Sequence, residues 1–437
     1  MLRAPRRTIA VVAAALAFTV ARPSGQSLAL DRQRGEMMLD TMAHDLHEQY
    51  YDPTFHGVDL DAHIATAKQR VRAASSIGEI FSIVAQVAVD LDDSHTRFLP
   101  PARATVVEYG WSTRCVGDVA YVNVVDAASD AARQGLLLGD RVLQIGGFTA
   151  NRQNERLIWY LLLGLRPQPS VRVVVQSPGG QPRTLDLAAK LTPGRGQIDL
   201  NNENDVDAMQ RLYERYASRT LRHEHVVLND TVHVWRMPYF DLTASEIDRQ
   251  FDKVGAASTL ILDLRANGGG REDGMLRVLG NLFDHDVVVG ELRERKSRRQ
   301  LLAKTRGHGR TFGGKLFVLV DSDSASASEV VARVVQLEHR GTIVGDRSSG
   351  SVMRATGVEH QLGADVSIYW GMEVTIADLV HPDGKSLERV GVTPDLLLLP
   401  TQEDLAARRD PVLAQVAGML GISLDPVKAG GLFASHN

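Results

Sequence analysis

The sequence predicts a modular α/β protein built from a helical unit, a β-rich unit and a layered core of strands and helices. Its 437 residues exceed what one compact core usually holds, so we expect two to four domains at about 150 residues each. Apolar residues recur at helical spacing near the N-terminus, short strands with glycine turns follow, and strands then alternate with helices. The composition, 44% hydrophobic and 23% charged, suits a globular chain.

Charge and cysteine content exclude several classes of protein. A net charge of -4 provides no basic field, so we expect no nucleic-acid partner. Cys115 is the only cysteine, which excludes an internal disulfide and a thiolate-cluster metal site. We expect this thiol to be buried and unreactive.

The first residues have the pattern of an export signal. Arg3, Arg6 and Arg7 precede an apolar run at residues 9–21 that ends in small residues. The run of 13 residues is shorter than the roughly 20 that cross a bilayer, so we expect cleavage and not anchoring. The sequence therefore predicts a signal peptide at residues 1–21, a periplasmic or extracellular location, and no membrane span in the mature chain.

A helical domain is expected at residues 31–100. Its clearest stretch places apolar residues at spacings of three and four on one stripe, namely Ile77, Ile80, Phe81, Val84 and Val87. The helical pattern ends near Leu91, before the polar cluster at 92–96.

A β-rich domain is expected at residues 106–191, with strands at Val119–Val125 and Arg141–Ile145 and with alternating valines at 171, 173 and 175. Its segment SDAARQGLLLGDRVLQIGG (129–147) resembles the helix-turn-strand core of PDZ domains. The resemblance implies that a peptide adds to the sheet edge as an extra strand. The alternative is a PDZ-shaped spacer, because no glycine-rich carboxylate-binding loop precedes the first strand. The sequence leaves both open.

Residues 204–401 alternate strands with helices, which predicts a layered sheet with strands at 232–237, 259–264 and 316–320. The last two strands precede turns rich in Gly, Ser or Asn. Ligands of such sheets gather at the carboxyl ends of strands, so we expect the chemistry at these turns. Residues 402–437 are expected to form a helical tail with a loose, Gly-rich end.

The run DSDSASASE (321–329) places Ser326 just before an expected helix at 330–337. Unpaired N–H groups and the helix dipole favour negative charge there, which suits an oxyanion forming on a substrate carbonyl. The structural alternative is that Ser326 only caps the helix, because Ser326 and Glu329 also form a capping-box pattern.

The pair TLILDLRANGGG (259–270) and VLVDSDSASASE (318–329) resembles the carboxy-terminal-processing and tricorn-core serine peptidases of the tail-specific protease superfamily. The resemblance covers most of residues 31–400 and includes the segments DSHT, HVWRMPYF, IVGDRSSG and ERVGVTPD. It implies a serine peptidase core of crotonase-like type. Aligned on the serine run, it implies that Ser326 is the nucleophile.

One departure bears on the mechanism. The tail-specific branch activates its serine with a lysine in the glycine turn after the helix, and Ser351 stands at that place here. The tricorn-like branch uses a histidine preceded by serine together with a late glutamate, which implies roles for Ser94, His95 and Glu388. A neutral imidazole is suited to take the serine proton, and Glu388, through Ser94, would hold its tautomer. The alternatives are a helix-end histidine that bonds terminal carbonyls and a solvated loop carboxylate.

An oxyanion needs N–H donors, and the candidates are Ala327 with Gly268 or Gly269. The alternative for the glycines is a flexible strand-to-helix turn. Asp263 and Arg265 are expected to be structural.

We expect no metal and no other cofactor. No His-Glu-x-x-His occurs, and the pairs His44 with His47 and His223 with His225 lack an evident third ligand.

Together these features predict an exported serine endopeptidase that acts on peptides or unfolded proteins. One alternative is a degenerate family member that binds peptides or small ligands without cleaving them, motivated by the missing lysine. Another is an esterase or amidase on the same machinery. The sequence leaves the oligomeric state open.

Overall fold

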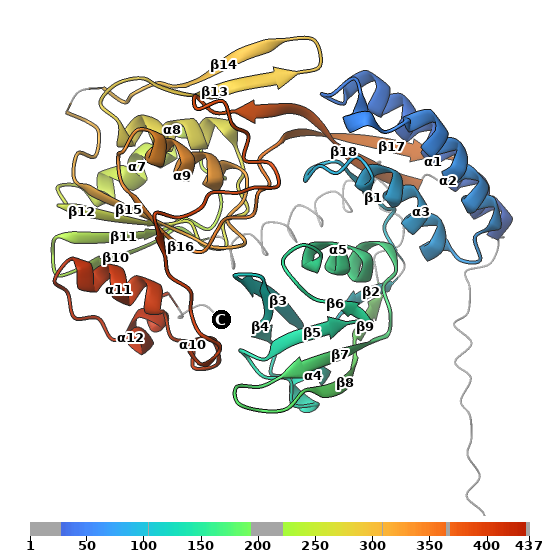
Figure 1. Ribbon diagram of the computed structural model, residues 1–437, viewed down its shortest axis with the longest axis horizontal. Coiled ribbons are helices and arrows are strands. Elements are labelled where there is room, and N and C mark those ends of the chain that lie inside the picture. Colours follow the sequence, from blue (N-terminus) through green and yellow to red (C-terminus); the bar gives the residue numbers. More distant parts are fainter. Residues whose placement is uncertain (1–27, 104, 194–221, 308, 364–367, 434–437) are drawn as a thin grey trace, which may run out of the picture.

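The computed structural model describes residues 28–103, 105–193, 222–307, 309–363 and 368–433. The predicted signal peptide at 1–21 lies outside these ranges. Within them, no helix combines the length and the apolarity that a membrane crossing needs. Figure 1 shows a helical unit in blue, a β-rich unit in green and a layered core in yellow to red.

The helical unit consists of α1 (Leu28–Gln49), the short 3-10 turn η1 (Phe55–Gly57), α2 (Leu60–Ala73) and α3 (Ile77–Val89). The predicted apolar stripe on α3 is buried at four of its five positions, Ile80, Phe81, Val84 and Val87. Ile77 is the exception and is 42% exposed, because it is the first residue of the helix. The helical prediction for this region is confirmed.

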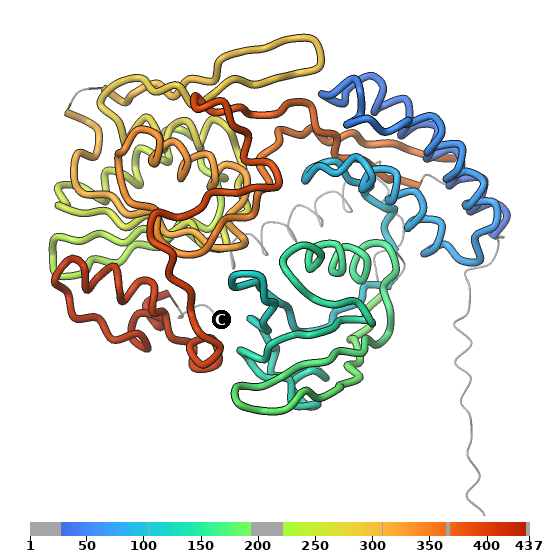
Figure 2. Tube along the Cα trace, in the orientation of Figure 1, coloured from blue at the N-terminus to red at the C-terminus, as the bar shows by residue number. Residues whose placement is uncertain are grey.

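A long strand joins the helical unit to the core. β1 (Arg97–Leu99) pairs with β18 (Ile368–Val380), which also pairs with β13 (Val287–Glu294) and β17 (Arg354–Leu362), while β14 (Arg298–Ala303) pairs with β13. Phe98, Trp370 and Met372 from this sheet are buried in the same cluster as the helices. The trace in Figure 2 follows β17 and β18 from the core to the blue helices. Because the polar cluster at 92–96 directly precedes β1, the pairing of β1 with β18 holds this cluster against the core.

The β-rich unit has its own sheet, in the order β3-β4-β5-β7-β8 with β6 beside β5. Its elements are β2 (Thr105–Glu108), β3 (Trp111–Val116), β4 (Val119–Val125), α4 (Asp130–Arg133), β5 (Arg141–Ile145), β6 (Phe148–Thr149), α5 (Glu155–Trp159), the π-helical turn η2 (Tyr160–Leu165), β7 (Ser170–Gln176), β8 (Arg183–Ala188) and β9 (Lys190–Pro193). The predicted strands at 119 and 141 are confirmed. Val171, Val173 and Val175 alternate with more exposed residues and are buried on one face of β7.

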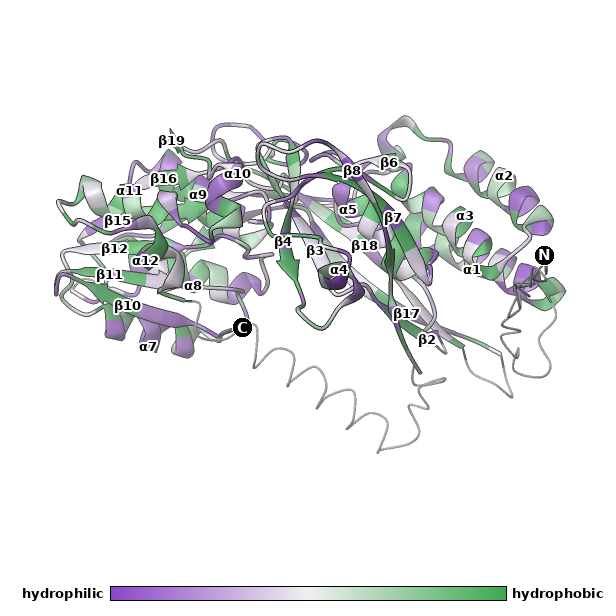
Figure 3. Ribbon diagram, turned by 90° about the horizontal axis from the view of Figure 1, so that it is seen from below, coloured by the Kyte–Doolittle hydropathy of each residue, from purple (hydrophilic) through white to green (hydrophobic). Residues whose placement is uncertain are grey.

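The core sheet has the order β10-β11-β12-β15-β16-β19, and all pairs after the first are parallel. These strands are β10 (Glu224–Leu228), β11 (Val232–Arg236), β12 (Thr259–Asp263), β15 (Lys315–Val320), β16 (Thr342–Gly345) and β19 (Leu396–Leu397). One face packs against α7 (Ala244–Val254), α8 (Glu272–Leu282) and α9 (Ala327–Leu337). In Figure 3 the outer face of α7 is hydrophilic while the strands above it are largely apolar. The layered α/β prediction is confirmed.

The C-terminal segment corrects one expectation. α10 (Gln402–Ala406), α11 (Pro411–Met419) and α12 (Pro426–Gly431) are helical as predicted, but the Gly-rich end is packed and not loose. Leu413 and Val416 of α11 share a buried cluster with Phe317 of β15 on the second face of the sheet. A Cβ added to Gly430 would lie 2.0 Å from the Arg408 carbonyl oxygen. Glycine therefore serves close packing here.

Parallel pairing places the two predicted turns at one edge of the sheet. β12 and β15 are neighbours, so the chain leaving each strand emerges on the same side. The turns contact each other, because the Ala325 N–H donates to the Asn267 carbonyl oxygen at 2.9 Å. Helix α9 begins at Ala327, three residues earlier than predicted.

Candidate active site

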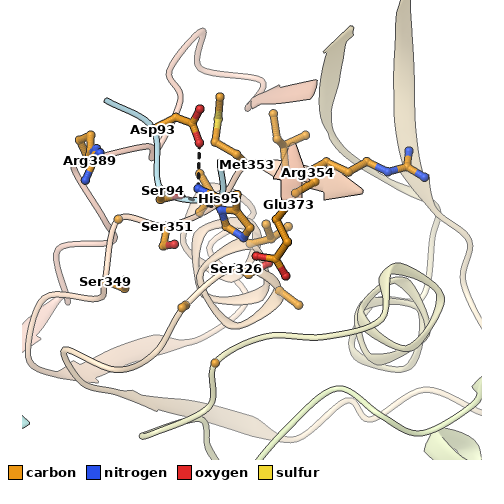
Figure 4. Close-up of a pocket in the computed structure, with 18 of the residues that line it drawn as sticks. Asp93, Ser94, His95, Ser326, Ser349, Ser351, Met353, Arg354, Glu373 and Arg389 are labelled. Carbon is orange, nitrogen blue, oxygen red and sulfur yellow. Dashed lines mark hydrogen bonds between the residues drawn. The ribbon is translucent and has the colours of Figure 1, made fainter. Parts of the chain in front are cut away.

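A cleft of about 1350 Å³ opens at this edge, and all three units contribute to its lining. Ser326 and Gly268 line it from the core, His95 from the end of the helical unit, and Arg156 from the β-rich unit. Figure 4 shows the ring of His95 directed toward the part of the cleft where Ser326 lies. Two residues far apart in sequence therefore share one cavity.

The backbone of Ser326 has an unusual conformation. Its φ is 55° and its ψ is -118°, whereas every other N-cap residue of the described helices has a negative φ. Such a conformation costs about 1–3 kcal/mol in a residue with a side chain. The Ser326 N–H donates to the Glu329 carboxylate at 3.1 Å and to the Ser351 carbonyl oxygen at 2.7 Å. The capping-box pattern is thus present, but an ordinary cap does not require this strain.

Gly269 lies directly against Ser326. Its φ is +101°, and an added Cβ would lie 2.5 Å from the Ser326 Cβ. Buried Asn267 fixes this turn, because its side chain accepts the Gly269 N–H at 2.9 Å and donates to the Met237 carbonyl oxygen at 2.8 Å. Asn267 was not predicted as a site residue, although its place before three glycines marks a turn.

The candidate oxyanion donors differ in whether their N–H groups already have a hydrogen-bond acceptor. The Gly269 N–H is already bonded to Asn267. No described residue accepts a hydrogen bond from the N–H of Gly268 or of Ala327, the first residue of α9. The geometry therefore favours Gly268 over Gly269 as the partner of Ala327.

A hydrogen-bonded chain runs from Glu388 to His95. The Ser94 hydroxyl donates to the Glu388 carboxylate at 2.9 Å and lies 2.7 Å from His95 Nδ1, and the Ser94 N–H donates to Glu388 at 2.7 Å. With Glu388 ionised, the Ser94 oxygen accepts the Nδ1 proton, which leaves the lone pair of the ring on Nε2. The expected alternative of a histidine bonded to helix-end carbonyls is therefore wrong for Nδ1. Glu388 is likewise not a solvated loop carboxylate, since its side chain is only 12% exposed.

Asp93 holds the turn that carries His95. Its Oδ1 accepts the N–H groups of His95 at 2.8 Å and Thr96 at 2.6 Å and the hydroxyl of Thr375 at 2.7 Å. Asp93 is buried and ties the turn to strand β18. The sequence analysis did not assign it a role.

Burial shifts both titratable groups of this chain. It lowers the pKa of His95, with Asp93 opposing the shift, so the imidazole is neutral at neutral pH. Burial raises the pKa of Glu388 to about 7, although hydrogen bonds from Val352 and Ser94 oppose the rise. The Glu388 carboxyl group therefore titrates near neutral pH.

Glu329 lies at the centre of a second network that the sequence analysis treated only as a cap. Its fully buried carboxylate accepts the Ser348 hydroxyl at 2.6 Å and the N–H groups of Gly350 at 2.7 Å, Ser351 at 2.8 Å and Ser326 at 3.1 Å. Burial raises its pKa while these bonds oppose the rise. One carboxylate thus joins the turn that carries Ser326 to the loop at 348–351.

The β-rich unit contacts the turn that precedes Ser326. Arg114 donates to Asp323 at 2.9 Å, and the Ser322 hydroxyl donates to the carbonyl oxygen of buried Cys115. Burial raises the pKa of the Cys115 thiol to about 12, in line with the expected low reactivity. Arg265, expected to be structural, bridges Asp263 and Asp410 of the core.

Within the described ranges, no group of three or more His, Cys, Asp or Glu is arranged to hold a metal ion. His47 pairs with Asp61, and His223 pairs with Asp241. His225 Nδ1 lies 2.7 Å from His233 Nε2.

Residues 231–398 match the family model for Peptidase family S41. This part of the chain is therefore similar to the S41 peptidases. The chain is 27% identical over 342 residues to the C-terminal processing peptidase, chloroplastic, of Tetradesmus obliquus, across 74% of this chain and 68% of that protein. It is 31% identical over 288 residues to the carboxy-terminal-processing protease of Bartonella bacilliformis, across 63% of this chain and 58% of that protein.

A solved structure extends the likeness to the fold. The crystal structure of mature CPAF gives a TM-score of 0.64 at 15% identity, across 86% of this chain and 94% of that one. The chain thus shares the fold of mature CPAF over most of its length. The curated proteins that it matches in sequence are C-terminal processing peptidases.

Proposed function

We propose that the chain is an exported serine endopeptidase of the tricorn-like branch, in which Ser326 is the nucleophile and His95 the general base. Glu388, acting through Ser94, orients the imidazole and stabilises its protonated form. The observation that carries this proposal is the hydrogen-bonded chain from Glu388 through Ser94 to His95, in the same cleft as the strained Ser326. The lysine that the resemblance to the other branch would place in the glycine turn after the helix is absent, and Ser351 stands there.

The proposed reaction uses these residues in turn. His95 Nε2 takes the proton of the Ser326 hydroxyl while the oxygen attacks the scissile carbonyl carbon. The N–H groups of Gly268 and Ala327 stabilise the oxyanion, each by about 2.7–4 kcal/mol. The imidazolium then gives its proton to the leaving amine as the C–N bond breaks. Water, deprotonated by the same imidazole, hydrolyses the acyl-enzyme and restores Ser326.

The β-rich unit is proposed to act as a PDZ-shaped spacer in this conformation. Trp159 of α5 donates to the Thr113 hydroxyl of β3 at 2.7 Å, and its ring lies 4.9 Å from that of Trp111. Glu155 also accepts the Thr113 hydroxyl. These side chains fill the space between α5 and β3, where an added peptide strand would need room.

Export is proposed from the basic and apolar pattern of residues 1–21. Its test is expression of the full chain followed by N-terminal sequencing of the periplasmic or secreted product. A product that begins shortly after residue 21 supports export, and an intact N-terminus in the cytoplasm contradicts it.

The catalytic proposal is tested with casein, an unstructured substrate, and with a fluorophosphonate probe. Ser326→Ala abolishes labelling and lowers turnover by at least about 10⁴-fold, and His95→Ala lowers turnover by about 10²–10⁴-fold. Ser349→Ala is the matched control, because Ser349 lines the same cleft and has no proposed role. Equal turnover and labelling in all variants would instead support the degenerate, ligand-binding alternative, which the family comparisons do not favour.

A further inference from the structure

Seven arginines line the cleft, and six of them pair with a carboxylate at 2.6 to 3.7 Å. Arg97 with Glu373 and Arg389 with Asp92 are two of these pairs. Arg156 is the exception, because no carboxylate of the described residues lies within ion-pair distance of it. Its charge acts on the carboxylates of Glu155 and Asp323 from beyond ion-pair distance, so its exposed N–H groups remain available to a ligand.

Arg156 belongs to a helical face that is turned to the cleft. Arg156, Leu157 and Tyr160 all line it, at the spacing of three and four residues that places side chains on one side of a helix, and Gln153 lines it from the turn before α5. Leu157 is 48% exposed on this face. The face therefore presents one cation beside one apolar side chain.

This face is fixed close to the proposed general base. The Tyr160 hydroxyl donates to the carbonyl oxygen of Phe98, which follows His95 by three residues in the chain. Arg103 bonds the carbonyl oxygen of Leu165 at the end of the same helical segment. The positive charge of Arg156 also contributes to the lowered pKa of His95, so the two groups lie within electrostatic range.

We propose that Arg156 is a specificity residue that binds an acidic side chain of the peptide close to the bond that is cleaved. This inference rests on the proposed function of the same cleft. A guanidinium offers paired N–H donors that match a carboxylate, and such charge-assisted bonds are stronger than neutral ones. The net charge of -4 provides no long-range attraction for acidic peptides, so the preference depends on this local cation.

The test uses peptides that are blocked at both ends, so that side chains carry the only carboxylates. Asp or Asn is placed at successive positions on both sides of one cleavable bond, and kcat/KM is measured for each peptide. The wild type is expected to prefer Asp over Asn about tenfold at one position. Arg156→Gln brings this ratio close to one, and Arg156→Lys retains part of it. The preference declines as salt is raised, because the site is exposed.

Arg172→Gln is the matched control, because Arg172 is an exposed arginine of the same unit that pairs with Asp186 outside the cleft. It should keep the wild-type ratio. A wild type that cleaves Asp and Asn peptides equally, or an Arg156→Gln variant that keeps the preference, would overturn this inference and leave the proposed function intact.

A binding measurement separates the two claims. In the Ser326→Ala background, fluorescence anisotropy should show tighter binding of the preferred Asp peptide than of its Asn partner, and Arg156→Gln should remove the difference. If no peptide is cleaved and Ser326 is not labelled, the proposed function fails. If Ser326→Ala binds both peptides equally, the proposed role of Arg156 fails and the proposed function is unaffected.

Discussion

Glu388 is the titratable residue whose ionisation controls the proposed relay. Its carboxylate accepts two hydrogen bonds from Ser94 and one from Val352, yet burial still raises its pKa to about 7. Burial lowers the pKa of His95 below the ordinary value of 6.5, so this ring is already neutral where Glu388 loses its proton. The ionised carboxylate is the form that accepts the hydrogen bond from the Ser94 hydroxyl.

The pH profile should therefore be limited by Glu388. We expect kcat/KM to rise with pH through an apparent midpoint of about 7, because deprotonation of Glu388 completes the relay while His95 is already a free base. In Glu388→Gln the midpoint near 7 disappears, and a lower rate remains that falls only below the ordinary pKa of histidine. A wild-type profile that is flat through neutral pH would contradict this assignment.

Gly269 is a position where one added methyl group should disturb Ser326, the proposed nucleophile. Its positive φ and the 2.5 Å approach of an added Cβ to Ser326 leave no room for alanine. We expect Gly269→Ala to lower the free energy of unfolding by about 1–3 kcal/mol in denaturant titrations and to slow labelling of Ser326. Gly268→Ala is the matched control for stability, since its nearest neighbour would be a Tyr239 ring atom at 3.9 Å. Equal losses in both variants would contradict the steric argument.

At the scale of elements, the N-terminus of α9 and the loop at 348–351 form one hydrogen-bonded unit around Glu329. Four donors converge on a carboxylate without solvent access. Removing the acceptor would leave buried donors unsatisfied, which costs more than the bonds contribute. The geometry of Ser326 thus depends on a residue one helical turn away.

Glu329→Gln tests this dependence. An amide places an NH2 group against N–H donors, so we expect a loss of about 2–4 kcal/mol in the free energy of unfolding and slower labelling of Ser326. Glu338→Gln at the other end of α9 is the control, because Glu338 is exposed and should tolerate the change. Wild-type labelling by Glu329→Gln would show that the network does not position the nucleophile.

For the whole molecule, periodicity and turn residues were sufficient to predict the strands at 119, 141 and 259 and the helices of the N-terminal unit. Spacing alone could not connect Ser94 with Glu388, which lie 294 residues apart, and only the family resemblance suggested their relation. The role of Asn267 and the bonds of Glu329 to the loop at 348–351 were missed, because a buried polar network is a property of tertiary packing. Local spacing predicts only the bond between Ser326 and Glu329 and not those that Glu329 makes with the distant loop.

The position of Ser326 also depends on how the β-rich unit docks on the core, and Arg152 mediates this docking. Its side chain, 11% exposed, donates to Asp346 at 3.1 Å and to the carbonyl oxygens of Gly117 at 2.9 Å and Ser348 at 3.0 Å. The loop that begins at Asp346 leads to Ser351, whose carbonyl oxygen accepts the Ser326 N–H. A contact made by the β-rich unit therefore restrains Ser326 in the core.

Arg152→Met keeps the length of the side chain but removes its charge and its donors. It leaves the largely buried Asp346 without its cation, so we expect a loss of about 3–5 kcal/mol in the free energy of unfolding and slower labelling of Ser326. Arg347→Met is the control, because Arg347 is more exposed and makes only a long contact of 3.7 Å with exposed Asp118, worth about 0–1 kcal/mol. If Arg152→Met is destabilised yet labels at the wild-type rate, the contact serves folding alone and the β-rich unit does not restrain the site.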